Sequence, residues 1–158
     1  MALKTPYNPL TIGLVIFGSF LGTFVLDIDY LIYAYVLEPA RDFSKTLKGF
    51  VQHADLSNAL MYIEYHKNEL GDKTLNSALF QIIFALFAIF VSASPASLFI
   101  KALVLSTCGN SIYRLWEAYL KGGINEWFWA FKSKPNKQGI ILYSLILLGI
   151  FIYCVAIL

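Results

Sequence analysis

The sequence predicts an all-α, polytopic integral membrane protein with four transmembrane helices and one cytoplasmic amphipathic helix. The 158 residues are 58% hydrophobic and only 14% charged, and the mean hydropathy is +0.65. Four long apolar segments each approach or exceed the roughly 20 residues that cross a bilayer. Most of the Lys and Arg lies in the two polar segments between them. So little charge leaves too little polar surface for a water-soluble domain, and we expect a single transmembrane domain, residues 1–158.

The four predicted spans cover about residues 10–37, 78–93, 97–120 and 138–158. The first continues well past signal-peptide length and lacks a clear cleavage site, so we expect a retained helix. The second is the shortest. Only residues 94–96, with Ser94 and Pro95 among them, separate it from the third, which predicts a tight helical hairpin.

The polar segment 38–77 contains apolar residues at helical spacing: Phe43, Leu47, Phe50, Ala54 and Met61. Charged and polar residues lie between them, which predicts one amphipathic helix over about residues 43–65 on the membrane surface or the rest of the protein. The second polar segment, 121–137, carries aromatic residues that suit the membrane interface: Trp127, Phe128, Trp129 and Phe131.

The distribution of Lys and Arg predicts the orientation. With four spans, both polar segments share one side of the membrane, and that side holds Arg41, Lys45, Lys48, Lys67, Lys73, Lys121, Lys132, Lys134 and Lys137. The opposite side holds only Lys4. Cytoplasmic loops carry the excess of Lys and Arg, so we expect both polar segments in the cytoplasm and both termini outside.

Polar residues from separate segments are predicted to meet at the cytoplasmic end of the bundle. Asp27 and Asp29 lie near that end of the first span, Asn76 opens the second, and Arg114 and Glu117 close the third. Asn110 lies about one turn deeper. An ionisable residue inside a membrane is a functional-site hypothesis and needs a partner. Arg114 is at the right depth to form an ion pair with either aspartate. A metal or substrate site, or exposure to cytoplasmic water, are the alternatives.

Four stretches in this order resemble the YdjM-type family of membrane-bound metal-dependent hydrolases, also described as LexA-binding inner-membrane proteins. They are VLDIDY at 25–30, KTLNSALF at 73–80, GNSIYR at 109–114 and GGINEWFWAF at 122–131. The family has motifs like LPDIDH, HRGxTHSLL and SHLLLD, then a Gly-rich turn and an aromatic segment. The resemblance implies a prokaryotic inner (cytoplasmic) membrane and a metal site built from these motifs.

This chain departs from the family at the positions that would bind metal. Tyr30, Asn76 and Asn110 stand where the family has histidines, and Arg114 replaces its second aspartate. A guanidinium keeps its proton, pairs with carboxylates and repels a cation. The resemblance therefore implies a divergent member in which an internal ion pair replaces the metal and no cofactor is needed.

The alternative is a working site for a divalent metal such as zinc or manganese. Asp27 and Asp29 would bind it together with His53 or His66, the two histidines of the chain, and Asn76 or Asn110 would assist. HADLSN at 53–58 can be aligned with the family's histidine motif instead. Solvated or interfacial positions are the simpler expectation for both histidines.

Other functions lack support in the sequence. The net charge is +2 and no basic patch alternates with aromatics, so we expect no nucleic-acid partner. Phosphate loops of the GxxxxGK type, GxSxG elbows and CxxC pairs are absent, and we expect Cys108 and Cys154 to be packing residues.

Three functions remain. The first is a non-catalytic relative of the hydrolases, with a polar pocket for a lipid headgroup or a protein partner. The second is an active metal-dependent hydrolase of a membrane-borne ester or phosphoester. The third is a small structural subunit of a membrane assembly. Membrane lipids are expected partners in each, and a homo-oligomer is compatible with all three.

Overall fold

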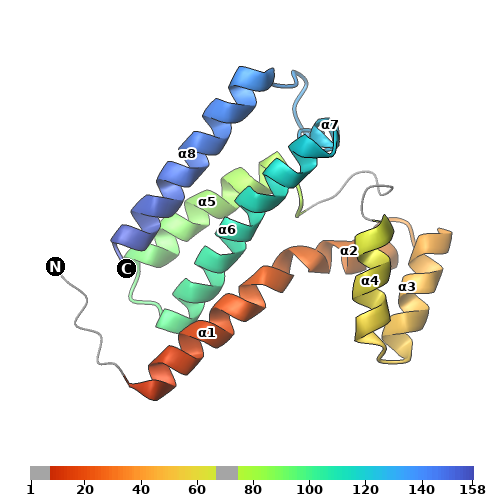
Figure 1. The fold of residues 1–158 in the computed structure, drawn as a ribbon, viewed down its shortest axis with the longest axis horizontal. Coiled ribbons are helices and arrows are strands. Elements are labelled where there is room, and N and C mark those ends of the chain that lie inside the picture. Colours follow the sequence, from red (N-terminus) through yellow and green to blue (C-terminus); the bar gives the residue numbers. More distant parts are fainter. Residues whose placement is uncertain (1–7, 67–74) are drawn as a thin grey trace.

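The structure, a computed structural model, describes residues 8–66 and 75–158. All regular structure in these residues is helical (Figure 1). The elements are α1 (Pro9–Phe24), the 3₁₀ helix η1 (Val25–Asp27), α2 (Ile28–Ile32), the π-helix η2 (Tyr33–Leu37), α3 (Asp42–Gln52), α4 (Leu56–His66), α5 (Ala78–Ala93), α6 (Leu98–Leu120), α7 (Ile124–Trp127) and α8 (Lys137–Ala156). The prediction of an all-α fold is confirmed.

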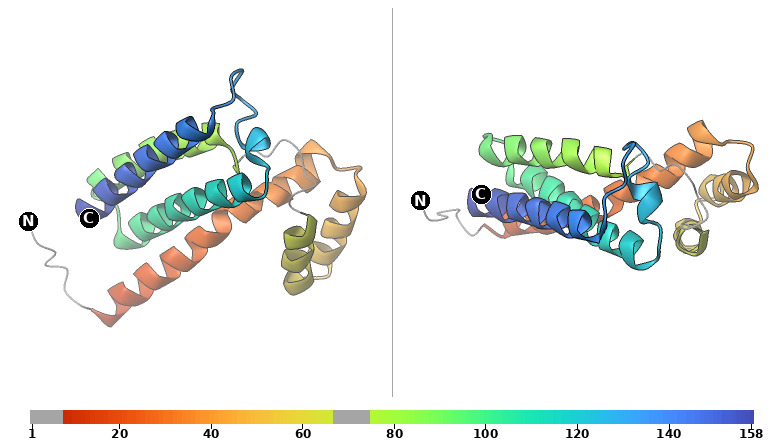
Figure 2. Two further views of the ribbon diagram at one scale, coloured as in Figure 1. Left: turned by 45° about the horizontal axis from the view of Figure 1, so that its top comes forward. Right: turned by 90° about the horizontal axis from the view of Figure 1, so that it is seen from above.

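Four long helices, α1, α5, α6 and α8, lie side by side (Figures 1 and 2). α1 and α6 run in one direction, and α5 and α8 run in the other. The last turn of α6, the first turns of α5 and α8, α2 and α7 therefore gather at one end, which we call the polar end. The start of α1, the α5–α6 turn and the end of α8 lie at the opposite end.

The long helices begin where the sequence supplies a capping side chain. The side chains of Asn8, Ser77, Ser97 and Asn136 accept hydrogen bonds from backbone N–H groups at the starts of α1, α5, α6 and α8. Such caps satisfy N–H groups that have no partner within the helix. The helix bounds agree with the four predicted apolar segments to within about two residues.

Two helical stretches are long and apolar enough to cross a membrane by length and composition: Pro9–Leu37, through α1 to η2, and Lys137–Ala156. These are the ones found among the described residues. α5 is apolar but has only 16 residues. α6 has 23 residues, but polar side chains such as Asn110, Arg114 and Glu117 interrupt it.

Two glycines bring α1 and α6 into close contact. A Cβ on Gly18 would lie 2.5 Å from the carbonyl oxygen of Phe99, and a Cβ on Gly22 would lie 2.4 Å from that of Leu103. The stretch GSFLG, residues 18–22, has the small-xxx-small spacing that lets membrane helices approach closely.

The segment predicted as one amphipathic helix forms two, α3 and α4. The backbone N–H groups of Ala54 and Asp55 donate to the carbonyls of Val51 and Phe50, and Ala54 has a φ of 55°. This pattern is a Schellman motif, which ends α3. The Asp55 carboxylate then caps α4 by accepting from the Asn58 N–H at 3.2 Å. Apolar spacing continues across the break, so the periodicity alone wrongly predicted one helix.

The predicted aromatic anchors divide into two groups. Trp129 and Phe131 are exposed, whereas Trp127 and Phe128 are each 5% exposed. The Gly122–Gly123 turn, with Gly122 at a φ of 80°, folds α7 back onto the end of α6 and the start of α8. There Trp127 and Phe128 join a buried cluster. The prediction of interfacial anchoring is therefore wrong for these two residues, because the turn reverses the chain.

Candidate functional site

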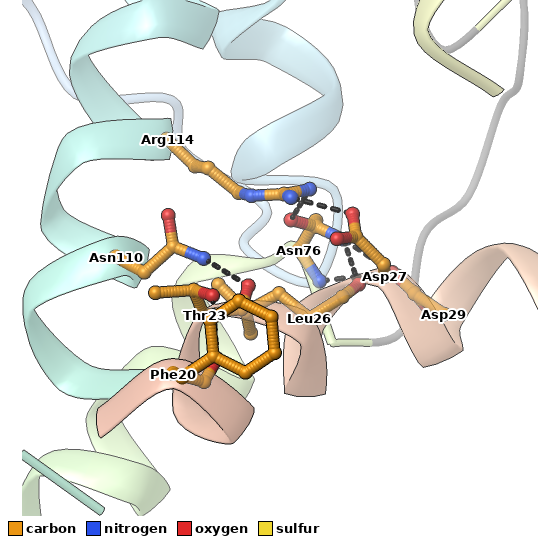
Figure 3. A network of polar contacts seen from close by, with 8 residues as sticks. All are labelled: Phe20, Thr23, Leu26, Asp27, Asp29, Asn76, Asn110 and Arg114. Atoms are coloured by element: carbon orange, nitrogen blue, oxygen red, sulfur yellow. Dashed lines mark hydrogen bonds and ion pairs between the residues drawn. The ribbon is translucent and has the colours of Figure 1, made fainter. Parts of the chain in front are cut away.

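The first long helix changes its winding where the two aspartates lie. Asp27 ends the 3₁₀ stretch and Asp29 lies in α2. Residues i and i+2 point to nearly opposite sides of a regular α-helix, and the 3₁₀ winding of about three residues per turn reduces that divergence. Both carboxylates consequently join one polar network at the polar end (Figure 3).

Asp27 and Arg114 form the ion pair that the sequence predicted. The Arg114 Nη2 lies 2.5 Å from the Asp27 Oδ1. The Arg114 side chain is 17% exposed and the Asp27 side chain is 23% exposed, so water screens the pair only partly. α1 and α6 run side by side in one direction. The close packing of Gly22 against Leu103 therefore also places Asp27 next to Arg114.

Asp29 is bound by Asn76, which directly precedes the cap of α5. Its carboxylate, on a residue only 2% exposed, accepts from the Asn76 backbone N–H at 2.9 Å and from the Asn76 Nδ2 at 3.0 Å. The same Nδ2 donates to the Leu26 carbonyl at 3.1 Å, and the Asn76 Oδ1 accepts from the Arg114 Nη1 at 3.4 Å. Asn76 therefore links both aspartates and the arginine, as Figure 3 shows.

Asn110 lies one turn deeper, as predicted, but holds the helices together instead of joining the ion pair. Its Nδ2 donates to the Thr23 carbonyl at 2.7 Å. Ser106 and Thr107 make similar bonds to the carbonyls of Ser19 and Gly22, at 2.6 and 3.0 Å. Hydrogen bonds between helices are the usual role of small polar side chains in membranes.

A pocket of about 200 Å³ opens beside the ion pair. Its lining residues come from α2, the residue before the cap of α5, the end of α6, the following turn and α7. Those with polar or aromatic side chains are Tyr30, Asn76, Arg114, Glu117, Lys121, Glu126 and Trp127. The Lys121 Nζ lies 2.7 Å from the Glu117 Oε1. The pocket wall thus carries charges of both signs.

The two histidines lie in the α3–α4 hairpin. His53 is exposed at the end of α3, and the His66 ring lies 4.2 Å from that of Tyr62 with its Nδ1 3.0 Å from the Tyr62 carbonyl oxygen. Within residues 8–66 and 75–158, no three His, Cys, Asp or Glu side chains are grouped so as to hold a metal ion. The structure thus brings together Asp27, Asp29, Asn76, Arg114 and Glu117, but not the ligand set with His53 or His66.

A second buried polar group was missed by the sequence analysis. The Gln81 Oε1 accepts from the Trp127 Nε1 at 3.2 Å and from the Tyr143 hydroxyl at 3.0 Å. These residues come from α5, α7 and α8, so the cluster joins the polar end of the bundle. A lone Gln inside the apolar segment 78–93 was the available signal, since a buried amide needs partners.

The chain matches no protein-family model, no curated protein and no solved structure. The resemblance to the YdjM-type hydrolases stays a prediction.

Proposed function

We propose that this chain is a four-span integral membrane protein that binds a lipid headgroup in the pocket at its polar end. In this proposal α1 with its continuation, α5, α6 and α8 are the spans. The polar end faces the cytoplasm, both termini lie outside, and the membrane is a prokaryotic inner membrane. As a relative of the YdjM-type hydrolases the protein is non-catalytic.

The surface of the helices supports the membrane part of the proposal. Large apolar side chains are exposed along α1, α5 and α8, for example Phe17 at 54%, Phe90 at 70% and Leu142 at 62%. Water-soluble monomers rarely expose apolar patches that extend over several helices. Polar side chains of α6 such as Thr107 and Asn110 donate hydrogen bonds to α1, which supports placing α6 in the bilayer despite its composition.

The observation that carries the binding role is the pocket beside Arg114. Within the described residues, the guanidinium contacts Asp27 and Asn76, which uses two of its five N–H donors. Arginine at a pocket wall is suited to bind phosphate, because its planar fork matches phosphate oxygens. The lining residues of the pocket lie at the polar end of the bundle, which is at the level of the lipid headgroups in the proposed topology.

The same contacts argue against metal-dependent hydrolysis. The carboxylate of Asp27 is paired with a permanent cation, and that of Asp29 accepts two hydrogen bonds from Asn76. A metal bound here would lie next to the guanidinium and be repelled by it.

Lipid retained through purification tests this function. The protein is extracted from membranes in a mild detergent and examined by native mass spectrometry. We expect bound phospholipid on the wild-type chain and less of it on Lys121→Gln, which removes one cation from the pocket wall. Lys132→Gln, exposed and outside the pocket, is the matched control and keeps the wild-type lipid.

Two results would overturn the proposal. One is a protein that partitions into the soluble fraction without detergent. The other is lipid retention that does not differ between wild type, Lys121→Gln and Lys132→Gln, because lipid would then be bound only to the outer apolar surface.

A further inference from the structure

We infer that the pocket recognises a zwitterionic headgroup, one that carries both a phosphate and a primary ammonium. This inference rests on the proposed binding of a lipid headgroup and names the class of headgroup. It follows from the arrangement of opposite charges around one small cavity.

The cationic side of the pocket is on α6. Arg114 and Lys121 lie seven residues apart, two turns along the same face, and both line the cavity. Arg114 is oriented by Asp27 and Asn76, so its guanidinium has a fixed position before a ligand arrives. Glu117 lies between Arg114 and Lys121 on α6, and its carboxylate is paired with the Lys121 Nζ at 2.7 Å. Arg114 is therefore the cation that offers N–H donors to a phosphate, while Lys121 neutralises the glutamate beside it.

The anionic side comes from Glu126 of α7, because the Glu117 carboxylate is already paired with the Lys121 Nζ. Glu126 lines the same cavity, and so does the next residue, the buried Trp127. An ammonium group is attracted by carboxylates and also by the face of a Trp ring. This side of the cavity therefore favours the cationic half of a zwitterion.

The balance of charges selects against a headgroup that is only anionic. Two cations and two carboxylates line the pocket, and Asp27 adds a third carboxylate directly behind Arg114. A lone phosphate would meet repulsion from the glutamates, whereas an ammonium on the same ligand turns that repulsion into attraction. Rejection of the wrong ligand by like charge is a common source of specificity.

The turn between α6 and α7 leaves room for the headgroup. Gly122 and Gly123 form this part of the wall, and a Cβ placed on Gly122 would have no heavy atom within 4 Å. Because neither glycine has a side chain, this part of the wall adds no bulk to the cavity.

The test uses the full-length protein in detergent and short-chain phospholipids as probes. Binding of dihexanoyl phosphatidylethanolamine, which has phosphate and ammonium, is compared with that of dihexanoyl phosphatidylglycerol, which has phosphate alone. We expect the ethanolamine lipid to bind about tenfold more tightly, the effect of one charge-assisted hydrogen bond. Free phosphoethanolamine is the third probe, because it carries the same charges without the acyl chains.

Variants separate the two sides of the pocket. Glu126→Gln is expected to weaken binding of the ethanolamine lipid about tenfold and leave the glycerol lipid unchanged or more tightly bound. Lys121→Gln is expected to weaken both. Asp42→Asn, an exposed carboxylate on α3 outside the pocket, changes neither. Circular dichroism of each variant confirms the fold before binding is compared.

The outcomes distinguish this inference from the function on which it rests. Equal affinity for the two lipids, together with no effect of Glu126→Gln, overturns the zwitterion and leaves lipid binding intact. No binding of either lipid overturns both. Free phosphoethanolamine that binds as tightly as the lipid supports the zwitterionic chemistry. It also shows that the acyl chains add nothing, which overturns a membrane lipid as the source of the ligand.

Discussion

Arg114 is the residue on which the polar end depends most. Its partner Asp27 is in α1's continuation and its second contact, Asn76, precedes α5, so one guanidinium joins three helices. Arg114→Ala would leave the Asp27 carboxylate without a cation. We expect it to lower the free energy of unfolding by about 2–3 kcal/mol, below the cost for a fully buried pair because both side chains are partly exposed.

Unfolding in increasing denaturing detergent measures this effect. Lys132→Ala, on an exposed residue, is the control and is expected to change stability by less than about 0.5 kcal/mol. In the double variant Asp27→Ala/Arg114→Ala the stranded carboxylate is gone, so the loss should be smaller than the sum of the two single losses. Additive losses would show that the two side chains do not interact.

Glu38 gives a prediction about pH at the junction of η2 and α3. The Tyr33 hydroxyl donates to the Glu38 Oε2 at 2.5 Å, and the Arg41 Nη1 lies 3.1 Å from that oxygen. The hydrogen bond from Tyr33 is the main cause that lowers the pKa of Glu38 below its ordinary value of 4.5, and Arg41 adds to the effect. A lowered folded-state pKa means that the contact stabilises the junction above the ordinary value and is lost as the pH falls through the lowered one.

Hydrogen exchange of the backbone around residues 38–44 checks this dependence. We expect opening of this segment, corrected for the intrinsic exchange rate, to increase as the pH falls below the ordinary pKa of Glu38. Tyr33→Phe removes the donor, so the pKa of Glu38 returns toward its ordinary value. The increase should then be smaller and level off at a higher pH. An unchanged profile in Tyr33→Phe would contradict the assignment.

At the scale of elements, the contact of α1 with α6 depends on glycine. A Cβ on Gly22 would meet the Leu103 carbonyl at 2.4 Å and the Ser106 Cβ at 2.8 Å, so the helices must move apart. We expect Gly22→Ala to destabilise by at least about 2 kcal/mol, as overpacking against a backbone does. Gly13→Ala, in the same helix with no heavy atom within 4 Å of its Cβ, is the matched control and should not destabilise.

The break between α3 and α4 gives a stabilising substitution. Ala54 has a φ of 55°, a conformation that costs an L-residue about 1–2 kcal/mol and glycine nothing. Ala54→Gly should raise the unfolding free energy by about 0.5–1 kcal/mol, after the greater flexibility of glycine in the unfolded chain is subtracted. Ala102→Gly, in the second turn of α6, should do the opposite, and both are measured by thermal unfolding.

The elements differ in how well their sequence predicts them. Length and apolar composition alone were sufficient for α1 with its continuation, α5, α6 and α8, because each is a long, mostly apolar segment with a capping residue before it. The α3–α4 break was not predictable from periodicity, since Ala54 is neither Gly nor Pro. Asp55, directly before Leu56, is the weak N-cap signal from which the start of α4 could have been predicted.

The candidate site shows the same contrast. Asp27 and Arg114 were paired correctly because their depths and charges are both readable from the sequence. The link between Gln81, Trp127 and Tyr143 was not, because those hydrogen bonds join residues 46 and 62 positions apart and depend on how the Gly122–Gly123 turn folds α7 back. Where a polar side chain has no charge to match, only the packing of the whole bundle selects its partner.

For the whole molecule, Lys101 marks the end opposite the pocket. Its Nζ donates to the Ser92 carbonyl at 2.9 Å, near the end of α5. Lysine near the C-terminal end of a helix satisfies a carbonyl and is favoured by the helix dipole. This lysine therefore stabilises the α5–α6 hairpin, while most of the other Lys and Arg residues lie at or beyond the polar end.

The number of spans can be decided by labelling single cysteines in intact cells with a reagent that does not cross membranes. The background carries Cys108→Ala and Cys154→Ala, since both native thiols are buried. If α5 and α6 cross the membrane, a cysteine at exposed Ala93, by the α5–α6 turn, lies on the side opposite Lys134, by the start of α8. We expect Ala93→Cys and Lys4→Cys to be labelled from outside, and Lys134→Cys only after the cells are opened, because the side rich in Lys and Arg stays in the cytoplasm.

Labelling of Lys134→Cys but not of Lys4→Cys would reverse the orientation. If Ala93→Cys is protected together with Lys134→Cys, the α5–α6 hairpin does not cross, and only Pro9–Leu37 and Lys137–Ala156 are spans.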